Sequence, residues 1–139
     1  ERQIRRIERL NPKVRAVITA MADEARETAR LVQPRPGSRA QGALAGLTVS
    51  IKDNIDVAGV RATAGSKFFG DRIANADAEV TARLRQAKAI LIAKVNLHEL
   101  AFGGTTQNPH HGSCRMTNPT PRTVWIRRAS PPASSLDRR

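Results

Sequence analysis

A lysine at the end of an apolar run is the side chain in this sequence best suited to acid–base chemistry. Residues 47–51 predict a β-strand, Lys52 follows directly, and Asp53 and Asn54 are typical turn residues. Ligand sites in α/β sheets collect at strand ends, and a partly buried lysine can lose its proton and act as a base. Taken alone, Lys52 fits a solvated strand end better, because most lysines that close a strand lie in water.

The histidines do not form a zinc motif. Glu99 follows His98, but a zinc-protease helix needs a second histidine four residues after the first, where Phe102 stands. Three further possible ligands are close in sequence but lack an identifiable fourth, and their surroundings are typical of a loop: His110, His111 and Cys114. We therefore expect no metal site.

Two other short motifs also fail. Ser66 precedes Lys67, the reverse of the order in a phosphate-binding loop, and Val60 stands where the first glycine of that loop is required. Asp53 and Asp56 lack the remaining oxygen ligands of a calcium loop. Turn formation is the simpler explanation for both segments.

The elements that must position these groups begin with two helices and a short strand. Apolar residues recur at helical spacing over residues 4–10, and we expect this helix to stop at Asn11 because Pro12 disfavours helical geometry in the residue before it. Residues 14–18 alternate and predict a short strand. Residues 23–32 predict a second helix with alanines on one face: Ala22, Ala25 and Ala29.

The middle of the chain predicts a strand, a helix and a second strand, after a loop at residues 33–38. Residues 47–51 are the first strand, and residues 89–93 are apolar throughout, as in a strand buried on both faces. Between them Asp77 is expected to cap a helix whose apolar face comprises Val80, Leu84 and Ala87. This order favours an α/β sheet.

A last short helix is expected after the second strand. Asn96 and Glu99 have the spacing of a capping box, and Gly103 with Gly104 would end the helix.

Charge and composition limit the class of protein. The formal charge of +12 over 139 residues would ordinarily suggest a nucleic-acid partner. The excess lies at the two ends, however: residues 1–41 hold ten basic and five acidic residues, residues 42–114 eight and six, and residues 115–139 six and one. We therefore do not expect nucleic-acid binding, although a small basic nucleic-acid-binding protein stays open as an alternative. The sequence shows no membrane-spanning run, and Cys114 is the single cysteine, so we expect a cytoplasmic protein.

Several segments together resemble the amidase signature family of amide hydrolases. They are the Lys-Asp-Asn turn at residues 52–54, Ala-Gly-Ser at 64–66, Asp-Ala-Glu-Val at 77–80, residues 93–99, and residues 103–109. All five occur in the family's order and spacing, which is far more specific than any one of them. The resemblance implies a mixed sheet flanked by helices, with residues 1–114 as the N-terminal part of one such domain.

The resemblance also implies a chemistry. In the family this lysine is the base of a Ser-cisSer-Lys triad that hydrolyses a carboxylic amide without a metal or organic cofactor, so Lys52 is the expected catalytic residue. Four residues resemble the loop lining that site, and a structural loop role fits them as well: Thr105, Thr106, Gln107 and Asn108. The implied partners are a small-molecule amide substrate, a second copy in a homo-oligomer, or the partner subunits of a tRNA-dependent amidotransferase. The amidase subunit of such an enzyme is the alternative to a general amidase.

The end of the chain departs from the family. Residues 115–139 are basic and rich in proline and serine, with no periodicity, and no glycine follows Gly112. We expect this tail to be disordered or read from another frame. Its serines lack the glycines that an oxyanion-binding turn needs, so we expect the chain, which keeps only the lysine of the triad, to be inactive.

Overall fold

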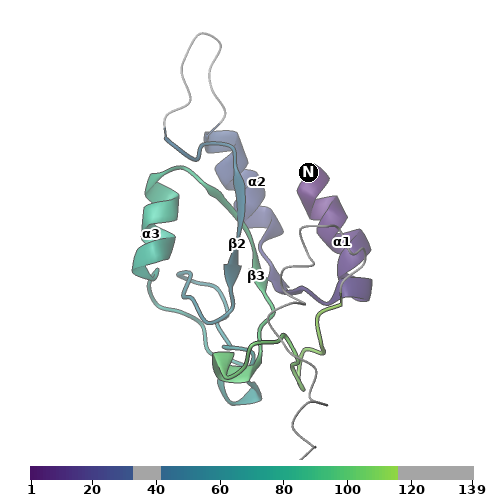
Figure 1. The fold of residues 1–139 in the computed structure, drawn as a ribbon. Helices are drawn as coiled ribbons and strands as arrows, with labels where there is room; N and C mark the ends of the chain where they lie inside the picture. The colour runs from purple at the N-terminus through teal and green to yellow at the C-terminus, as the bar shows by residue number, and fades with distance from the viewer. Residues whose placement is uncertain (33–41, 116–139) are drawn as a thin grey trace, which may run out of the picture.

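The computed structural model describes residues 1–32 and 42–115, and shows a three-stranded mixed sheet with helices packed against it (Figure 1). The expected α/β class, a mixed sheet flanked by helices, is confirmed. The loop expected at residues 33–38 and the tail from residue 116 onward lie outside the described residues. No helix in the described part is long and apolar enough to cross a membrane.

The centre of the sheet is the strand predicted to be buried on both faces. This strand, β3 (Ile90–Val95), lies between β1 (Val17–Ala20) and β2 (Thr48–Lys52). It pairs antiparallel with β1 and parallel with β2, and its first five residues are buried. Since β2 and β3 are parallel, the chain must cross over between them, and α3 (Glu79–Gln86) lies in this connection. Lys52 therefore lies at the carboxyl end of a parallel strand pair.

The first helix, α1 (Arg2–Val14), extends past the proline that was expected to stop it. Pro12 lacks an N–H and so leaves one helical bond unmade, but the next turn still closes, with Arg15 N donating to Asn11 O over 2.8 Å. The Asn11 side chain also donates to Val17 O and accepts from Val17 N. These bonds offset the local cost of the proline, so β1 begins three residues later than predicted.

Small aliphatic side chains fill the core on both faces of the sheet. On one face α1 and α2 (Ala22–Leu31) cover β3, and the buried cluster there comprises Ile4, Ala25, Ile90, Ile92 and Ala93. On the other face the buried cluster comprises Met21, Ile51, Val57 and Leu91. Neither buried cluster includes an aromatic residue.

The third helix, α3, is anchored differently from the prediction. Its N-cap is Ala78, and Asp77 accepts a hydrogen bond from Ala58 N (2.7 Å) and pairs with Arg85 (2.8 Å). Val80 was predicted to be on the apolar face but is 47% exposed. The fully buried residue is Thr81, whose hydroxyl donates to Asp56 O. A long-range contact therefore outweighs the local capping preference of Asp77.

Candidate functional site

Lys52 is the last residue of β2, and its neighbours on both sides are held by the sheet. Ile51 is buried in the core, Asp53 N donates to Val95 O (3.0 Å), and Ile55 N donates to Lys52 O (2.9 Å). The Lys52 side chain is exposed. The structure thus presents an accessible lysine on a fixed backbone at the strand end where α/β sheets collect ligands.

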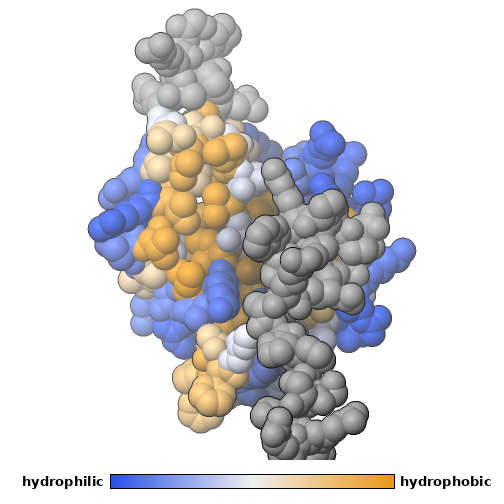
Figure 2. All heavy atoms as spheres, viewed as in Figure 1, coloured by the Kyte–Doolittle hydropathy of each residue, from blue (hydrophilic) through white to orange (hydrophobic). Residues whose placement is uncertain are grey.

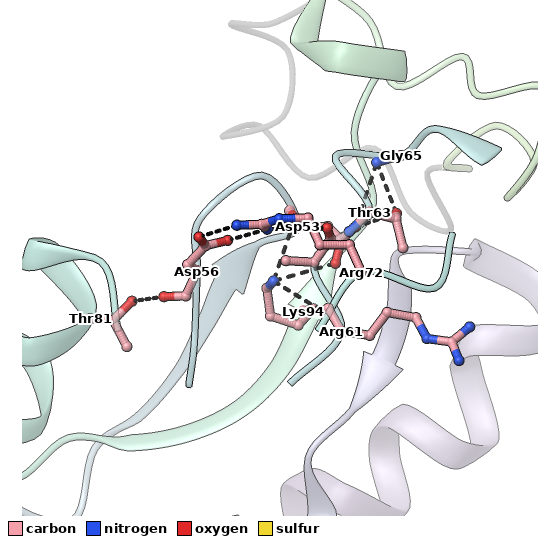
Figure 3. Close-up of polar contacts among 9 residues, drawn as sticks. Asp53, Asp56, Arg61, Thr63, Gly65, Arg72, Thr81 and Lys94 are labelled. Carbon is pink, nitrogen blue, oxygen red and sulfur yellow. Dashed lines mark hydrogen bonds and ion pairs between the residues drawn. The ribbon is translucent and has the colours of Figure 1, made fainter. Parts of the chain in front are cut away.

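The neighbouring carboxylate points inward. Asp53 is fully buried, and its Oδ2 accepts hydrogen bonds from Thr63 N (2.9 Å), Thr63 Oγ1 (2.5 Å) and Gly65 N (3.5 Å) (Figure 3). The prediction that Asp53 shapes the turn agrees with these contacts. They tie the turn after Lys52 to the loop at residues 61–65.

A second lysine, Lys94, lies behind this turn with no exposed surface. Its Nζ is 3.4 Å from Asp53 Oδ1, and it donates to Asp53 O (3.4 Å) and Arg61 O (3.3 Å) (Figure 3). Burial lowers the pKa of Lys94 below its ordinary value, although the charge of Asp53 opposes this shift. Sequence reasoning missed this pair. The available signal was a lysine immediately after a wholly apolar run, which on a strand buried on both faces has no route to water.

A second ion pair braces the segment that follows. Arg72 binds Asp56 through two bonds of 2.7 and 2.6 Å, and Asp56 O accepts from Thr81 (2.7 Å) (Figure 3). The hydrogen bonds from Arg72 lower the pKa of Asp56. The bidentate pair ties the loop after Lys52 to the segment around Arg72, and the Thr81 bond ties it to the first turn of α3, so the lysine is followed by a well-anchored loop.

The loop of Thr105, Thr106, Gln107 and Asn108 has one clear anchor. Asn108 is buried and donates to Gly65 O (2.7 Å) and Leu97 O (3.0 Å), and its Oδ1 accepts from the backbone N of His110 and of His111. Thr105 contacts His98 through its carbonyl oxygen (2.9 Å), and Thr106 O accepts from Cys114 N. Gln107 is exposed. Asn108 therefore holds the loop against the Gly65 turn, and a substrate-lining role for the loop stays a prediction.

The capping box predicted at Asn96 and Glu99 is wrong. The short helix is η2 (Glu99–Ala101), its N-cap is His98, and Asn96 instead donates to Arg15 O and Gly112 O. Glu99 accepts from Ser66 Oγ (2.8 Å) and lies 3.1 Å from His110 Nε2. Those two hydrogen bonds lower the pKa of Glu99. Because the helix begins at Glu99 with His98 as its N-cap, neither Asn96 nor Glu99 occupies a capping-box position, and both side chains serve long-range contacts.

The side chains that could ligate a metal, for which the sequence predicted no site, are separated or engaged elsewhere in the described residues. Across residues 1–32 and 42–115, no three His, Cys, Asp or Glu side chains come together as possible ligands. His110 is engaged with Glu99, and the Cys114 thiol donates to Arg15 O (3.4 Å). Burial raises the pKa of that thiol.

The family is decided by comparison with known proteins. A family model described as Amidase matches residues 1–126. The chain belongs to this amidase family. A curated relative, a glutamyl-tRNA(Gln) amidotransferase subunit from Synechococcus sp., is 37% identical over 81% of this chain.

Solved structures of amidase-family proteins have the same fold. A bacterial aryl acylamidase of the amidase signature enzymes superposes with a TM-score of 0.74 at 30% identity, covering 83% of this chain and 24% of that one. The corresponding glutamyl-tRNA(Gln) amidotransferase subunit from Thermotoga maritima superposes with a TM-score of 0.63 at 28% identity. That match covers 81% of this chain and 22% of the Thermotoga chain. This amidase-family chain spans only 23% of the length of the Synechococcus relative.

Proposed function

We propose that this chain contributes the lysine of an amide-hydrolysing site, with Lys52 as the general base. The observation that carries the proposal is the direction of the neighbouring carboxylate. Asp53 points into the core toward Lys94, and within the described residues Lys52 forms no ion pair. The inward turn of Asp53 therefore leaves the Lys52 amine accessible to a proton donor at the end of the strand.

The reaction that we propose uses the Lys52 amine as the proton acceptor. Lys52 Nζ accepts the proton of a bridging serine hydroxyl, and the bridging serine takes the proton of a second serine. The oxygen of that second serine bonds to the amide carbonyl carbon. The C–N bond then breaks as the leaving nitrogen takes up a proton, and water hydrolyses the resulting ester. The two serines of such a triad are implied by the family resemblance, and we identify neither in this sequence.

A graft tests the role of the lysine. We would replace the matching N-terminal part of the aryl acylamidase with residues 1–115 and measure amide hydrolysis, then introduce Lys52→Met. Loss of a general base should lower kcat about 10²- to 10⁴-fold with a much smaller change in KM. The matched control is Lys67→Met, which removes another exposed lysine and should change neither kcat nor KM. A Lys52→Met graft that retains full kcat would contradict the base role.

A second candidate is the corresponding component of an amidotransferase. It is favoured by eight curated relatives, all of them glutamyl-tRNA(Gln) amidotransferase subunits of one kind, which are 34–39% identical to this chain. The closer superposition on the aryl acylamidase favours the hydrolase instead. Grafting residues 1–115 into the Thermotoga protein separates the two. Restored amidotransferase activity there, with no hydrolysis in the acylamidase background, would favour the amidotransferase.

A further inference from the structure

Five basic side chains form a stripe along α1. They are exposed, and at about 100° of rotation per residue they fall within an arc of about 100°. We call them the basic stripe: Arg2, Arg5, Arg6, Arg9 and Lys13. The opposite side of the helix holds Ile4 and Ile7, which pack into the core. The stripe therefore faces away from the sheet, where hydrophilic residues are visible on the α1 side of the molecule (Figure 2).

The charges of the basic stripe are not neutralised locally. Across the residues that the structure describes, none of the five makes an ion pair, and Glu1 at the start of the helix binds Arg26 instead (2.7 Å). Four arginines outside α1 do have close carboxylate partners: Arg26, Arg72, Arg83 and Arg85. The stripe is thus a row of five positive charges on one helix that has no carboxylate partner among the described residues.

Folding alone does not account for this arrangement. Cations three and four positions apart on a helix repel each other, and cations near the N-terminus oppose the helix dipole. The first turn of α1 contains no acidic residue that would offset these effects. Lys13 is in the last turn, where the dipole favours a cation, but the arginines of the stripe cost the isolated helix stability, and a polyanion bound along them would remove that cost.

We propose that the basic stripe binds the phosphodiester backbone of a double-stranded nucleic acid, independently of amide chemistry at Lys52. From Arg2 to Lys13 the helix rises about 16 Å, a length over which one strand of a duplex carries about five phosphates. The apolar face of α1 is already packed against the sheet, so the helix cannot insert it into a lipid surface. This distinguishes the stripe from a membrane-binding amphipathic helix.

The surroundings of the stripe favour a duplex over a single strand. Proteins that bind single strands stack the bases on aromatic side chains. The aromatic residues in the described part of the chain are Phe68, Phe69 and Phe102, and none belongs to α1. Contacts would then be to phosphates alone, so binding should be independent of base sequence and strongly dependent on salt.

Fluorescence anisotropy with the full chain tests the proposal. Labelled 20-base-pair RNA and DNA duplexes would be titrated at several salt concentrations with the natural chain and with the triple variant Arg2→Gln, Arg5→Gln, Arg9→Gln. Losing three phosphate contacts should reduce the slope of log Kobs against log salt by about three and weaken binding at least tenfold. Glu8→Gln removes an acid from the same helix and should strengthen binding. Preference for one duplex would identify the source of the phosphates.

The control is a second triple variant with the same change in net charge away from α1: Lys67→Gln, Arg83→Gln and Lys88→Gln. Residues 116–139 are common to all variants, so any binding by them contributes equally to each affinity and does not affect the comparison. Equal losses in the two triple variants, or no loss in the α1 variant, would overturn the proposal. So would stripe-dependent binding to vesicles of anionic lipid or to poly-glutamate with none to either duplex. Circular dichroism would verify that α1 stays folded.

Discussion

Asp53 and Lys94 are both fully buried and face each other across the end of the β2–β3 pair, with Lys94 Nζ 3.4 Å from Asp53 Oδ1. Two charges taken out of water stabilise a fold only while each has the other and the surrounding hydrogen bonds. Thr63 and Gly65 provide those bonds to Asp53, and two carbonyl oxygens provide them to Lys94. The pair therefore couples the turn after Lys52 to the central strand.

Removing one partner of this pair should be costly. We expect Lys94→Met or Asp53→Asn to lower the free energy of unfolding by about 3–5 kcal/mol, because each leaves a buried group without its partner. The double variant should lose less than the sum of the two single losses. Urea denaturation of the natural chain, the two single variants and the double variant checks this. Additive losses would show that the two side chains act independently.

Acid should weaken the link between Asp56 and Arg72. The pKa of Asp56 is lower in the folded chain than its ordinary value of 3.8, so the folded state binds this proton less readily than the unfolded state. Its contribution is fully present above pH 3.8 and is lost as the pH falls through the lower folded pKa. Urea melts from about pH 6 to about pH 2 should show this loss. In Asp56→Asn the free energy of unfolding should depend less on pH over this range. The same pH dependence in Asp56→Asn as in the natural chain would contradict this role of Asp56.

We expect the purified chain to hydrolyse simple amides no faster than its Lys52→Ala variant. The reason is that no glycine follows Gly112, so the sequence lacks the glycine- and serine-rich segment that would bear the nucleophile. Ammonia release over several hours checks this. Turnover that disappears in Lys52→Ala would contradict the expectation and point to a serine outside the described residues as nucleophile: Ser130, Ser134 or Ser135.

The outer edge of β2 should promote self-association. Within the described residues β2 pairs only with β3, Leu47 beside it is 56% exposed, and apolar residues cover the face over α3 and β2 (Figure 2). Open apolar edges pair readily with other chains. Sedimentation velocity should detect concentration-dependent association, which Thr48→Lys with Ser50→Lys reduces. A monomer at all concentrations would show that this edge is protected.

Local pattern was enough to predict the elements whose own residues determine them. Residues 89–93 could be assigned to a central strand because an apolar run of that length is buried in any α/β arrangement. The second helix and the strand ending at Lys52 were also recovered to within one residue. Each of these elements forms through its own propensity and packing.

Side-chain partners distant in sequence could not be predicted. Asp77 and Asn96 both had the local features of helix caps, but each binds groups that the fold brings from elsewhere. The inward direction of Asp53 likewise depends on Thr63 and Lys94. Local capping is worth only about 1 kcal/mol, so tertiary contacts readily override it.

The antiparallel pairing of β1 with β3 has a consequence for synthesis. Val17 pairs with Val95, so β1 leaves the ribosome long before its partner strand has been made. At about 5–20 residues per second, the intervening segment takes roughly 4–16 s to translate. Until then α1 and α2 can form only local structure, and the strand between them has no neighbour within the sheet. The nascent N-terminus should thus be a chaperone target until residue 95 has emerged.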